Sequence, residues 1–276
     1  MPTEIPNPTA EQALLKKKMK AMWMDGQYDL IANHLMPEAE EFIARLQLRS
    51  ADRLLDVACG TGNLSLPAAQ AGAKVTGLDI APNLLEVARA RAAAAGLSIQ
   101  FDEGDAEQLP YEDETFDVVV TMFGAMFAPN PVKVAAELIR VCRSGGRLAM
   151  ANWTPEGFVG DFFRITAKHV PPLADLPSPL LWGREESVRE RLDGKNSDLR
   201  LTRRMLTFRY PFREAEVVEF YRDYFGPTRQ AFAALNAGGQ AALFKDMERL
   251  WAENNQATDG TTVVQAEYLE VVASRS

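Results

Sequence analysis

This 276-residue sequence contains little cysteine and histidine and has no excess of positive charge. Its two cysteines, Cys59 and Cys142, are too few for a disulfide framework, which favours a reducing compartment. We expect Cys59 to be buried in a loop and Cys142 to lie on an apolar helix face. No cluster of His, Cys, Asp and Glu has the spacing of metal ligands, so we expect no bound metal.

The charge balance and the hydropathy exclude two classes of partner. The formal net charge is −8, and Lys and Arg are mixed with acids along the chain, so we expect no face that neutralises nucleic-acid phosphates. No apolar run approaches the roughly 18 residues of a membrane-spanning helix. The first twenty residues carry prolines and acids where a signal peptide has an apolar core, so the sequence predicts a cytoplasmic protein.

What the sequence does contain is an alternation of short branched runs and helix-forming stretches. Strands are predicted at 53–59, 74–80, 98–105, 116–123 and 146–153. The stretch 83–96 follows Ala81-Pro82, is rich in helix formers and stops at Gly96, as a helix does. Strands of near-continuous apolar character between helices indicate a parallel sheet covered on both faces, that is, a doubly wound, Rossmann-like α/β core.

The flanking segments differ from this core. Helical spacing predicts helices at 10–23 and 36–48, whereas prolines at 170–183 predict an irregular connection before a short helix. Beyond it, strands are predicted at 199–212 and 261–276, with helices at 213–225 and 239–255. We therefore expect one domain over 1–276, with parts in this order: an N-terminal helical cap at 1–50, the core at 51–153, a lid-like insertion at 154–196 and a C-terminal part at 197–276.

The turn after the first predicted strand is shaped for a ligand. In open α/β sheets, ligands lie beyond the carboxyl ends of the strands. In "LLDVACGTGNLSLPAA" (54–69), Gly60 and Gly62 permit positive φ and remove side chains that would block a ligand. The free N–H groups of the helix that opens near Asn63 suit a phosphate, a carboxylate or an uncharged ligand edge.

One acid follows each of three predicted strands, a pattern that a plain core does not need. Asp56 ends the first strand, where its carboxylate can accept hydrogen bonds from a cationic amine. Asp79 ends the second, where an acid can receive both hydroxyls of a ribose. Asp105 follows the third strand.

Three stretches together resemble the motifs of a known family. They are "LLDVACGTGNLSLPAAQAGAKVTGLDIAPNLLEVAR" (54–89), "FDEGDAEQLPYEDETFDVVVTMFG" (101–124) and "LIRVCRSGGRLAMANW" (138–153). In order and spacing they resemble class I S-adenosylmethionine-dependent methyltransferases, in particular the branch similar to ubiquinone/menaquinone biosynthesis C-methyltransferases. The resemblance covers about 53–153 and implies a seven-stranded, mostly parallel sheet with an antiparallel last strand, and S-adenosylmethionine as the cofactor.

The resemblance also assigns ligand contacts along the chain. It implies that a loop holds the methionine part, that strand ends hold the ribose and adenine, and that a residue after the fourth strand lies near the sulfonium. The loop residues are Asp56, Ala58, Gly60 and Gly62. At the strand ends, the resemblance assigns Asp79 and Ile80 to the ribose and adenine, and Asp105 and Ala106 to the adenine edge. Met122 is the residue near the sulfonium. We expect Tyr28 to cover the cofactor. Ala58 replaces a usual glycine, so we expect a slightly tighter loop and retained binding.

Two other functions share part of this pattern. A nicotinamide dehydrogenase has the same turn, helix and second-strand acid, but its third glycine position is Ser65 here, and Asp56 would repel a pyrophosphate. A cofactor-binding protein without turnover, acting as a regulator or assembly partner, would keep the same binding residues.

Methyl transfer by in-line displacement needs positioning more than a catalytic side chain. A base is needed only if the nucleophile arrives protonated, and His34 and His169 are the candidates, although each is more typical of a surface or core residue. Aromatic residues can line an apolar pocket for a small organic acceptor; these are Trp23, Phe123, Phe127 and Trp153. Carbon, oxygen and nitrogen acceptors stay open, as does the choice between monomer and homodimer.

Overall fold

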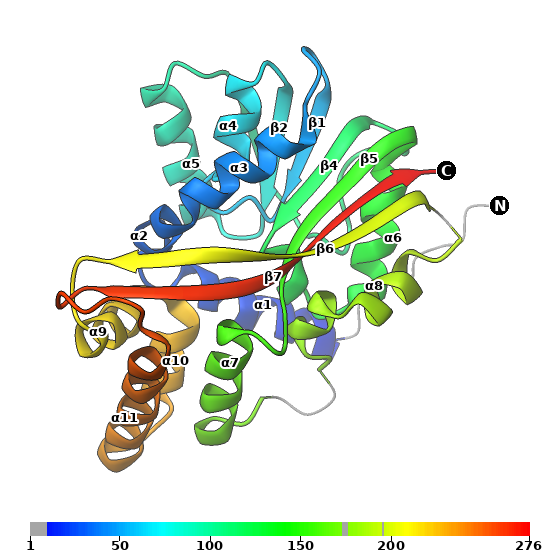
Figure 1. Cartoon of the computed structure of the whole chain (residues 1–276). Coiled ribbons are helices and arrows are strands. Elements are labelled where there is room, and N and C mark those ends of the chain that lie inside the picture. Colours follow the sequence, from blue (N-terminus) through cyan, green and yellow to red (C-terminus); the bar gives the residue numbers. More distant parts are fainter. Residues whose placement is uncertain (1–9, 173–175, 195) are drawn as a thin grey trace.

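A seven-stranded sheet runs through the molecule in the strand order β3-β2-β1-β4-β5-β7-β6. The structure is a computed structural model that describes residues 10–172, 176–194 and 196–276 (Figure 1). The strands are β1 (Arg53–Val57), β2 (Lys74–Asp79), β3 (Gln100–Glu103), β4 (Phe116–Met122), β5 (Cys142–Trp153), β6 (Asn196–Tyr210) and β7 (Thr262–Arg275). The first five are parallel, and β7 is antiparallel to both of its neighbours, β5 and β6. The predicted seven-stranded sheet with its antiparallel last strand is confirmed.

Helices cover both faces of this sheet. With α3, α4 and α5 on one face and α6 and α8 on the other, the core is doubly wound as predicted (Figure 1). The helices are α1 (Ala10–Met24), α2 (Tyr28–Ala32), α3 (Met36–Leu46), α4 (Ser65–Gln70), α5 (Pro82–Ala94), α6 (Pro131–Val141), α7 (Phe158–His169), α8 (Glu185–Leu192), α9 (Glu214–Tyr224), α10 (Gly226–Ala233) and α11 (Ala237–Asn254). Short 3-10 turns lie at η1 (Asn33–Leu35), η2 (Ala125–Phe127) and η3 (Pro179–Gly183).

The central strands are buried because both of their faces are covered. In β1, Leu54, Leu55 and Val57 are fully buried, and so are the valines of β4 at 118–120. Such near-continuous apolar runs are typical of parallel strands between helical layers. The prediction that Cys142 lies on a helix face is wrong, because the chain leaves α6 at Val141 and Cys142 begins β5 in extended conformation.

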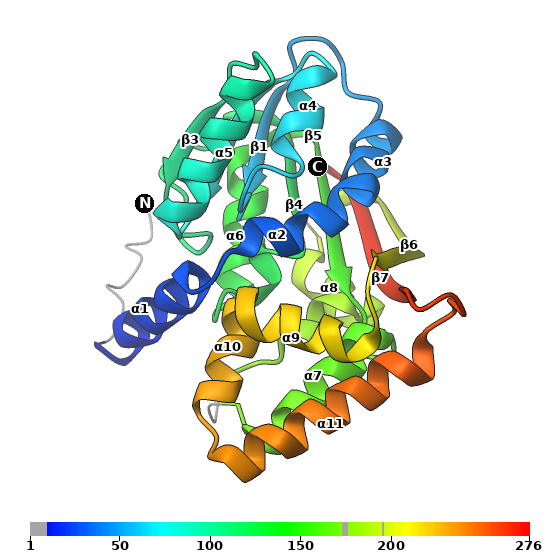
Figure 2. The same ribbon diagram turned by 90° about the vertical axis from the view of Figure 1, so that its left-hand side faces the viewer.

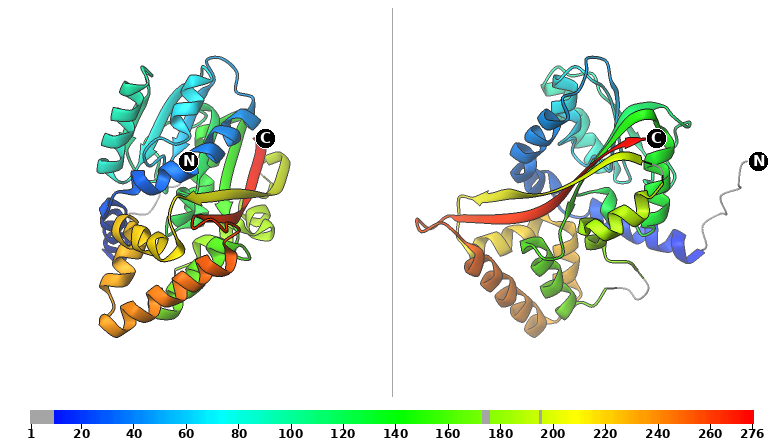
Figure 3. Two further views of the ribbon diagram at one scale, coloured as in Figure 1. Left: turned by 60° about the vertical axis from the view of Figure 1, so that its left-hand side comes forward. Right: turned by 45° about the vertical axis from the view of Figure 1, so that its right-hand side comes forward.

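Four helices gather past the carboxyl ends of the parallel strands. Both views in Figure 3 show α7, α9, α10 and α11 at this end, with the long β6–β7 pair running beside them. Of these, α7 and α10 were not predicted. The segment 154–196, predicted as a lid, contributes to two places in the structure. Its helix α7 lies among these four helices, whereas its helix α8 packs against α6 on one face of the sheet.

The N-terminal helices are fastened to this helical group at a crowded glycine. Gly26, between α1 and α2, has φ +90°, and a Cβ there would lie 2.4 Å from the carbonyl oxygen of Tyr224. The neighbouring Gln27 N–H donates to that same carbonyl at 3.0 Å, and Arg229 pairs with Asp25 at 2.9 Å. In Figure 2, α1 and α2 lie in front, beside α9 and α10. The contact fixes the segment that carries Trp23 and Tyr28.

Two features are absent from the residues that the structure describes. Among them, no helix combines the length and the apolar character needed to cross a membrane. In the same residues, no three side chains of the ligating types converge in a way that could hold a metal ion.

Gly26→Ala is expected to lower the free energy of unfolding by about 2–5 kcal/mol. About 1–2 kcal/mol comes from the positive φ and about 1–3 kcal/mol from crowding against Tyr224. Gly96→Ala is the matched control, because Gly96 has φ +66° but no atom within 4 Å of the place that an added methyl would take, so only the backbone strain is added. Urea unfolding of both variants measures the difference, and equal losses would contradict the close approach at Gly26.

Candidate active site

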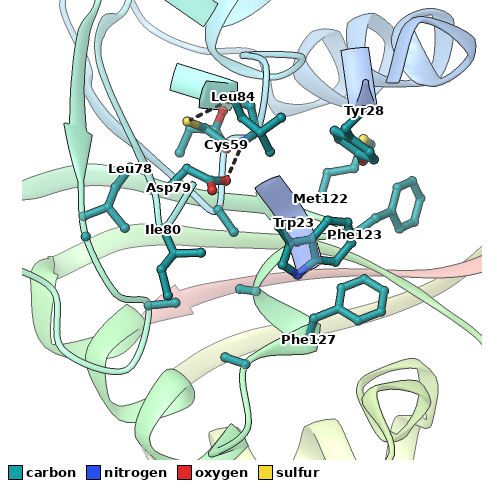
Figure 4. Close-up of a pocket in the computed structure, with 18 of the residues that line it drawn as sticks. Trp23, Tyr28, Cys59, Leu78, Asp79, Ile80, Leu84, Met122, Phe123 and Phe127 are labelled. Carbon is teal, nitrogen blue, oxygen red and sulfur yellow. Dashed lines mark hydrogen bonds between the residues drawn. The ribbon is translucent and has the colours of Figure 1, made fainter. Parts of the chain in front are cut away.

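A cavity opens at the carboxyl ends of β1, β2 and β4, where the sequence predicts a ligand. It encloses about 990 Å³, counting its open mouth. Nine of the ten predicted cofactor residues line it: Tyr28, Asp56, Ala58, Gly60, Asp79, Ile80, Asp105, Ala106 and Met122. In Figure 4, Asp79 lies on one side of the cavity, and Trp23, Phe123 and Phe127 lie on the other.

Gly62, the tenth predicted residue, shapes the loop without lining the cavity. It has φ +84°, and a Cβ there would lie 2.8 Å from Leu66 and 3.5 Å from Ala88. Its N–H donates to the carbonyl of Cys59 at 2.9 Å, which closes the turn. Gly62 therefore lets the turn pack against α4 and α5, while Gly60, with φ +53°, forms the cavity wall.

Ala58, the departure from the glycine-rich pattern, also adopts a left-handed conformation, with φ +56°. Its carbonyl and methyl lie close to Gly124, where a Cβ would be 2.5 Å from the Ala58 oxygen and 2.7 Å from the Ala58 methyl. The missing side chain at Gly124 therefore leaves room for the extra methyl. Sequence reasoning did not identify Gly124, because the contact joins the ends of two different strands.

Asp56 is a buried carboxylate without a cationic partner among the described residues. It is 1% exposed and accepts a hydrogen bond from the Ser65 hydroxyl at 2.6 Å. Burial raises the pKa of Asp56 to about 7, with the charge of Asp79 adding to the effect and the hydrogen bond from Ser65 opposing it. A cationic group entering the cavity would stabilise the ionised form.

Asp79 holds the glycine loop while facing the cavity. Its two oxygens accept hydrogen bonds from the N–H groups of Gly60 at 2.8 Å and Ala81 at 2.9 Å. Burial raises the pKa of Asp79, whereas these backbone donors lower it. Each carboxylate oxygen keeps a lone pair after its backbone hydrogen bond, so Asp79 can still accept from two neighbouring hydroxyls.

Asp105 lines the cavity but is paired with a lysine that the sequence analysis did not single out. Lys16 of α1 forms ion pairs with Asp105 and, at 2.8 Å, with Glu107. Burial lowers the pKa of Lys16, but the hydrogen bonds to these two carboxylates outweigh it and raise the pKa overall. No local pattern marks Lys16, because its neighbours Lys17 and Lys18 are exposed as a solvated helix face would be.

Tyr28 lies over the glycine loop, as a cover would. A Cβ at Gly60 would be 3.4 Å from the Tyr28 ring, and the Tyr28 ring contacts that of Trp23 edge-on, with centroids 5.7 Å apart. Burial raises the pKa of Tyr28, and the charge of Asp79 raises it further, so the hydroxyl stays protonated near neutral pH. Within the described residues no side chain or backbone group is hydrogen-bonded to this hydroxyl.

A second cavity adjoins the first and is walled by aromatic rings. The two cavities share five lining residues: Trp23, Tyr28, Leu35, Phe123 and Phe127. The second continues between α7, α9 and α11. The four aromatic residues proposed for an acceptor pocket all line it, since Trp153 joins Trp23, Phe123 and Phe127 there. Sequence reasoning missed the rings that α7 supplies because α7 itself was not predicted.

Neither histidine is among the residues that line the two cavities. His34 packs against Tyr210, with ring centroids 4.2 Å apart, and burial lowers its pKa. His169 ends α7, where its Nε2 lies 2.9 Å from a carboxylate oxygen of Asp246 on α11. Neither lines a cavity, and each has structural partners.

Known sequences resemble this chain either over its core or over nearly its full length. Residues 55–150 match the family described as a methyltransferase domain. Uncharacterized protein Rv1405c of Mycobacterium tuberculosis is 37% identical over 273 residues, 98% of this chain and 99% of that protein. Demethylmenaquinone methyltransferase of Deinococcus radiodurans is 40% identical over 127 residues, 45% of this chain and 53% of the enzyme. Similarity to that enzyme therefore covers less than half of this chain.

Solved structures share the fold at low sequence identity. The YcgJ protein of Bacillus subtilis has a TM-score of 0.57 at 18% identity, covering 86% of this chain and 98% of its own. Geranyl diphosphate methyltransferase in complex with S-adenosylmethionine has a TM-score of 0.52 at 21% identity, covering 87% of this chain and 85% of its own. With the domain match, the full-length relative and the sheet topology together, the chain belongs to the class I S-adenosylmethionine-dependent methyltransferases, resembling those of ubiquinone and menaquinone biosynthesis.

Proposed function

We propose that the first cavity binds S-adenosylmethionine and that the protein transfers its methyl group to a small organic acceptor by in-line displacement. One observation carries the proposal: two buried carboxylates, Asp56 and Asp79, end neighbouring strands in a cavity floored by an open glycine loop. The ammonium, the sulfonium and the ribose diol of S-adenosylmethionine supply the cationic and hydroxyl partners that these carboxylates lack. A pyrophosphate beside the glycine loop would be repelled by Asp56, which disfavours a nicotinamide cofactor.

The ammonium, the ribose, the adenine and the sulfonium of the methyl donor each have a matching group in the cavity. The ammonium would pair with Asp56, and the ribose hydroxyls would donate to the free lone pairs of Asp79. The adenine would lie along Ile80 and Ala106, beside Asp105, with Tyr28 covering the loop. The sulfonium would then lie near Met122, on the side where the second cavity begins.

Positioning supplies most of the catalysis in this proposal. The sulfonium is already an activated electrophile, and holding the reactants in a near-attack geometry is worth roughly 7–11 kcal/mol of the barrier. We assign no histidine base, because neither His34 nor His169 lines either cavity. The lining side chains exclude water, orient the acceptor and leave any released proton to the solvent.

A cofactor-binding protein without turnover is the alternative function. Asp56 and Asp79 serve binding alone and do not distinguish the two. The adjoining second cavity favours an enzyme, because a regulator has no need of a chamber for a second small molecule. Transfer of labelled methyl groups from S-adenosylmethionine to a panel of phenols, amines and quinone-like acceptors separates the two functions.

S-adenosylmethionine and its demethylated product are both expected to raise the melting temperature. A ligand at 100 times its Kd adds about 2.7 kcal/mol to the stability of the folded state, which shifts Tm by several degrees. NADH at the same concentration is the control and should leave Tm unchanged. A shift with NADH and none with the methyl donor would overturn the proposed cofactor.

Asp79→Ala is expected to weaken S-adenosylmethionine binding by about 1–3 kcal/mol, because charged hydrogen bonds to the ribose are lost. It should also lower the stability of the free protein, since the N–H groups of Gly60 and Ala81 lose their acceptor. Asp193→Ala, at an exposed acid, is the control and should change neither quantity. Calorimetry measures the affinity, and an unchanged Kd for Asp79→Ala would contradict the ribose assignment.

The affinity for S-adenosylmethionine is expected to rise with pH through the pKa of Asp56. Because the folded pKa is about 7 and the ordinary value is 3.8, Asp56 contributes stability to the free protein that is complete below about pH 4 and lost as pH rises through 7. The ammonium needs the ionised form, so binding should be about tenfold weaker at pH 6 than at pH 8. Asp56→Asn should bind weakly and without this pH dependence. An equally steep profile in Asp56→Asn would remove Asp56 from the amine site.

A further inference from the structure

The second cavity contains rings but no charged side chain. Fifteen residues line it, and none of them is Asp, Glu, Lys, Arg or His. Beyond the five residues shared with the first cavity, the lining includes Trp153, Phe158, Val159, Phe162, Phe163 and Trp251. We infer that this cavity is the methyl-acceptor site and that it selects an uncharged, planar aromatic molecule. This inference rests on the proposed function and names its substrate class.

The absence of charge in the lining excludes ionised acceptors. A carboxylate, phosphate or ammonium buried there would lose its hydration and find no opposite charge, which costs several kcal/mol per ion. Few polar atoms replace that charge. The hydroxyl of Tyr221 is already hydrogen-bonded to that of Tyr210 at 2.9 Å, whereas the hydroxyl of Tyr28 has no partner in the described residues. Because Tyr28 lines both cavities and burial keeps its hydroxyl protonated, this hydroxyl can donate one hydrogen bond to a neutral acceptor.

The arrangement of the rings favours a flat molecule over an aliphatic one. Phe127 and Phe163 stack with centroids 5.9 Å apart and planes 24° apart, and Phe127 also meets Trp23 edge-on at 5.1 Å. In the same lining, Phe123 stacks on Trp153 with ring centroids 3.7 Å apart. Faces and edges at these angles complement another aromatic ring, because offset stacked and edge-to-face pairs add about 0.5–1.5 kcal/mol beyond the area buried.

The rings also suit the movement of charge during transfer. A lone pair of the acceptor forms the new bond to the methyl carbon, and the electrons of the S–CH₃ bond return to sulfur as a neutral thioether. The positive charge therefore passes from sulfur to the acceptor, and an acceptor that carried a hydrogen on the methylated atom then loses a proton to water. Trp23, Phe123 and Phe127 lie where the two cavities meet, so their ring faces can stabilise that charge on either side of the transfer.

Three probes that share one skeleton test the charge and shape requirements. Calorimetry on the protein saturated with the demethylated cofactor would use 2-naphthol, 2-naphthoate and decahydro-2-naphthol. We expect 2-naphthol to bind at least about tenfold more tightly than its anionic and its aliphatic counterpart. Equal or tighter binding of 2-naphthoate overturns the charge requirement, and equal binding of the decahydro compound overturns the aromatic one. If the cofactor itself fails to bind, the proposed function fails instead, so the two failures are distinguishable.

A pair of variants on α7 places the probe in this cavity. Val159 is partly buried and lines only the second cavity. Val159→Asp adds a charge and should weaken 2-naphthol binding by about tenfold or more. Val159→Asn adds a side chain of the same shape as Asp but without the charge, and it should weaken binding less. Both variants should keep their affinity for the cofactor. Phe163→Leu, at a partly exposed ring, is a second variant that tests the same wall if Val159→Asp does not fold. Unchanged 2-naphthol affinity in Val159→Asp, or in Phe163→Leu where the first does not fold, overturns the assignment of the acceptor site.

Discussion

The site depends on one interaction, the pair of hydrogen bonds that Asp79 accepts from the loop after β1 and from its own helix start. Parallel pairing of Val57 with Leu78 brings the ends of β1 and β2 side by side, and the carboxylate of Asp79 then reaches the N–H of Gly60 at 2.8 Å. A buried carboxylate is tolerated only where such donors compensate its lost hydration. The same oxygens that fix the loop therefore present the cavity with negative charge, and structure and ligand binding share one residue.

The periodicity of the sequence was sufficient to predict the core but not the helical group that closes it. The strands predicted at 53–59 and 116–123 are present at 53–57 and 116–122, because both faces of each are buried and their sequences are mainly apolar. Cys142 was misplaced because the change from helix to strand occurs within one apolar run, from Val141 to Cys142, with no glycine or proline between them. The helix α7 was not predicted, because the prolines that follow it led to an irregular connection being expected for the whole segment.

The cofactor residues were predictable for a related reason, since they stand at strand ends whose position the parallel sheet dictates. Side chains brought in from distant elements were not. Lys16 reaches Asp105 across 89 residues of chain, and Gly124 meets Ala58 only because β1 and β4 are neighbours. His34 shows the opposite error: chemical type made it a candidate, whereas its contacts with Tyr210 and Phe220 make it part of an aromatic cluster.

The two cavities divide the electrostatic tasks that methyl transfer imposes. The first offers carboxylates to a cationic donor, whereas the second is lined by aromatic and aliphatic side chains whose only polar groups are hydroxyls and indole N–H groups. If carboxylates also surrounded the acceptor, they would hold the positively charged product in the cavity. They would also attract water beside a reactive sulfonium. Rings attract a cation more weakly and without water, so charge can leave sulfur while the solvent stays out. The boundary formed by Trp23, Tyr28, Phe123 and Phe127 is therefore where the proposed chemistry would occur, and Gly26 holds the two of these rings that the N-terminal segment supplies.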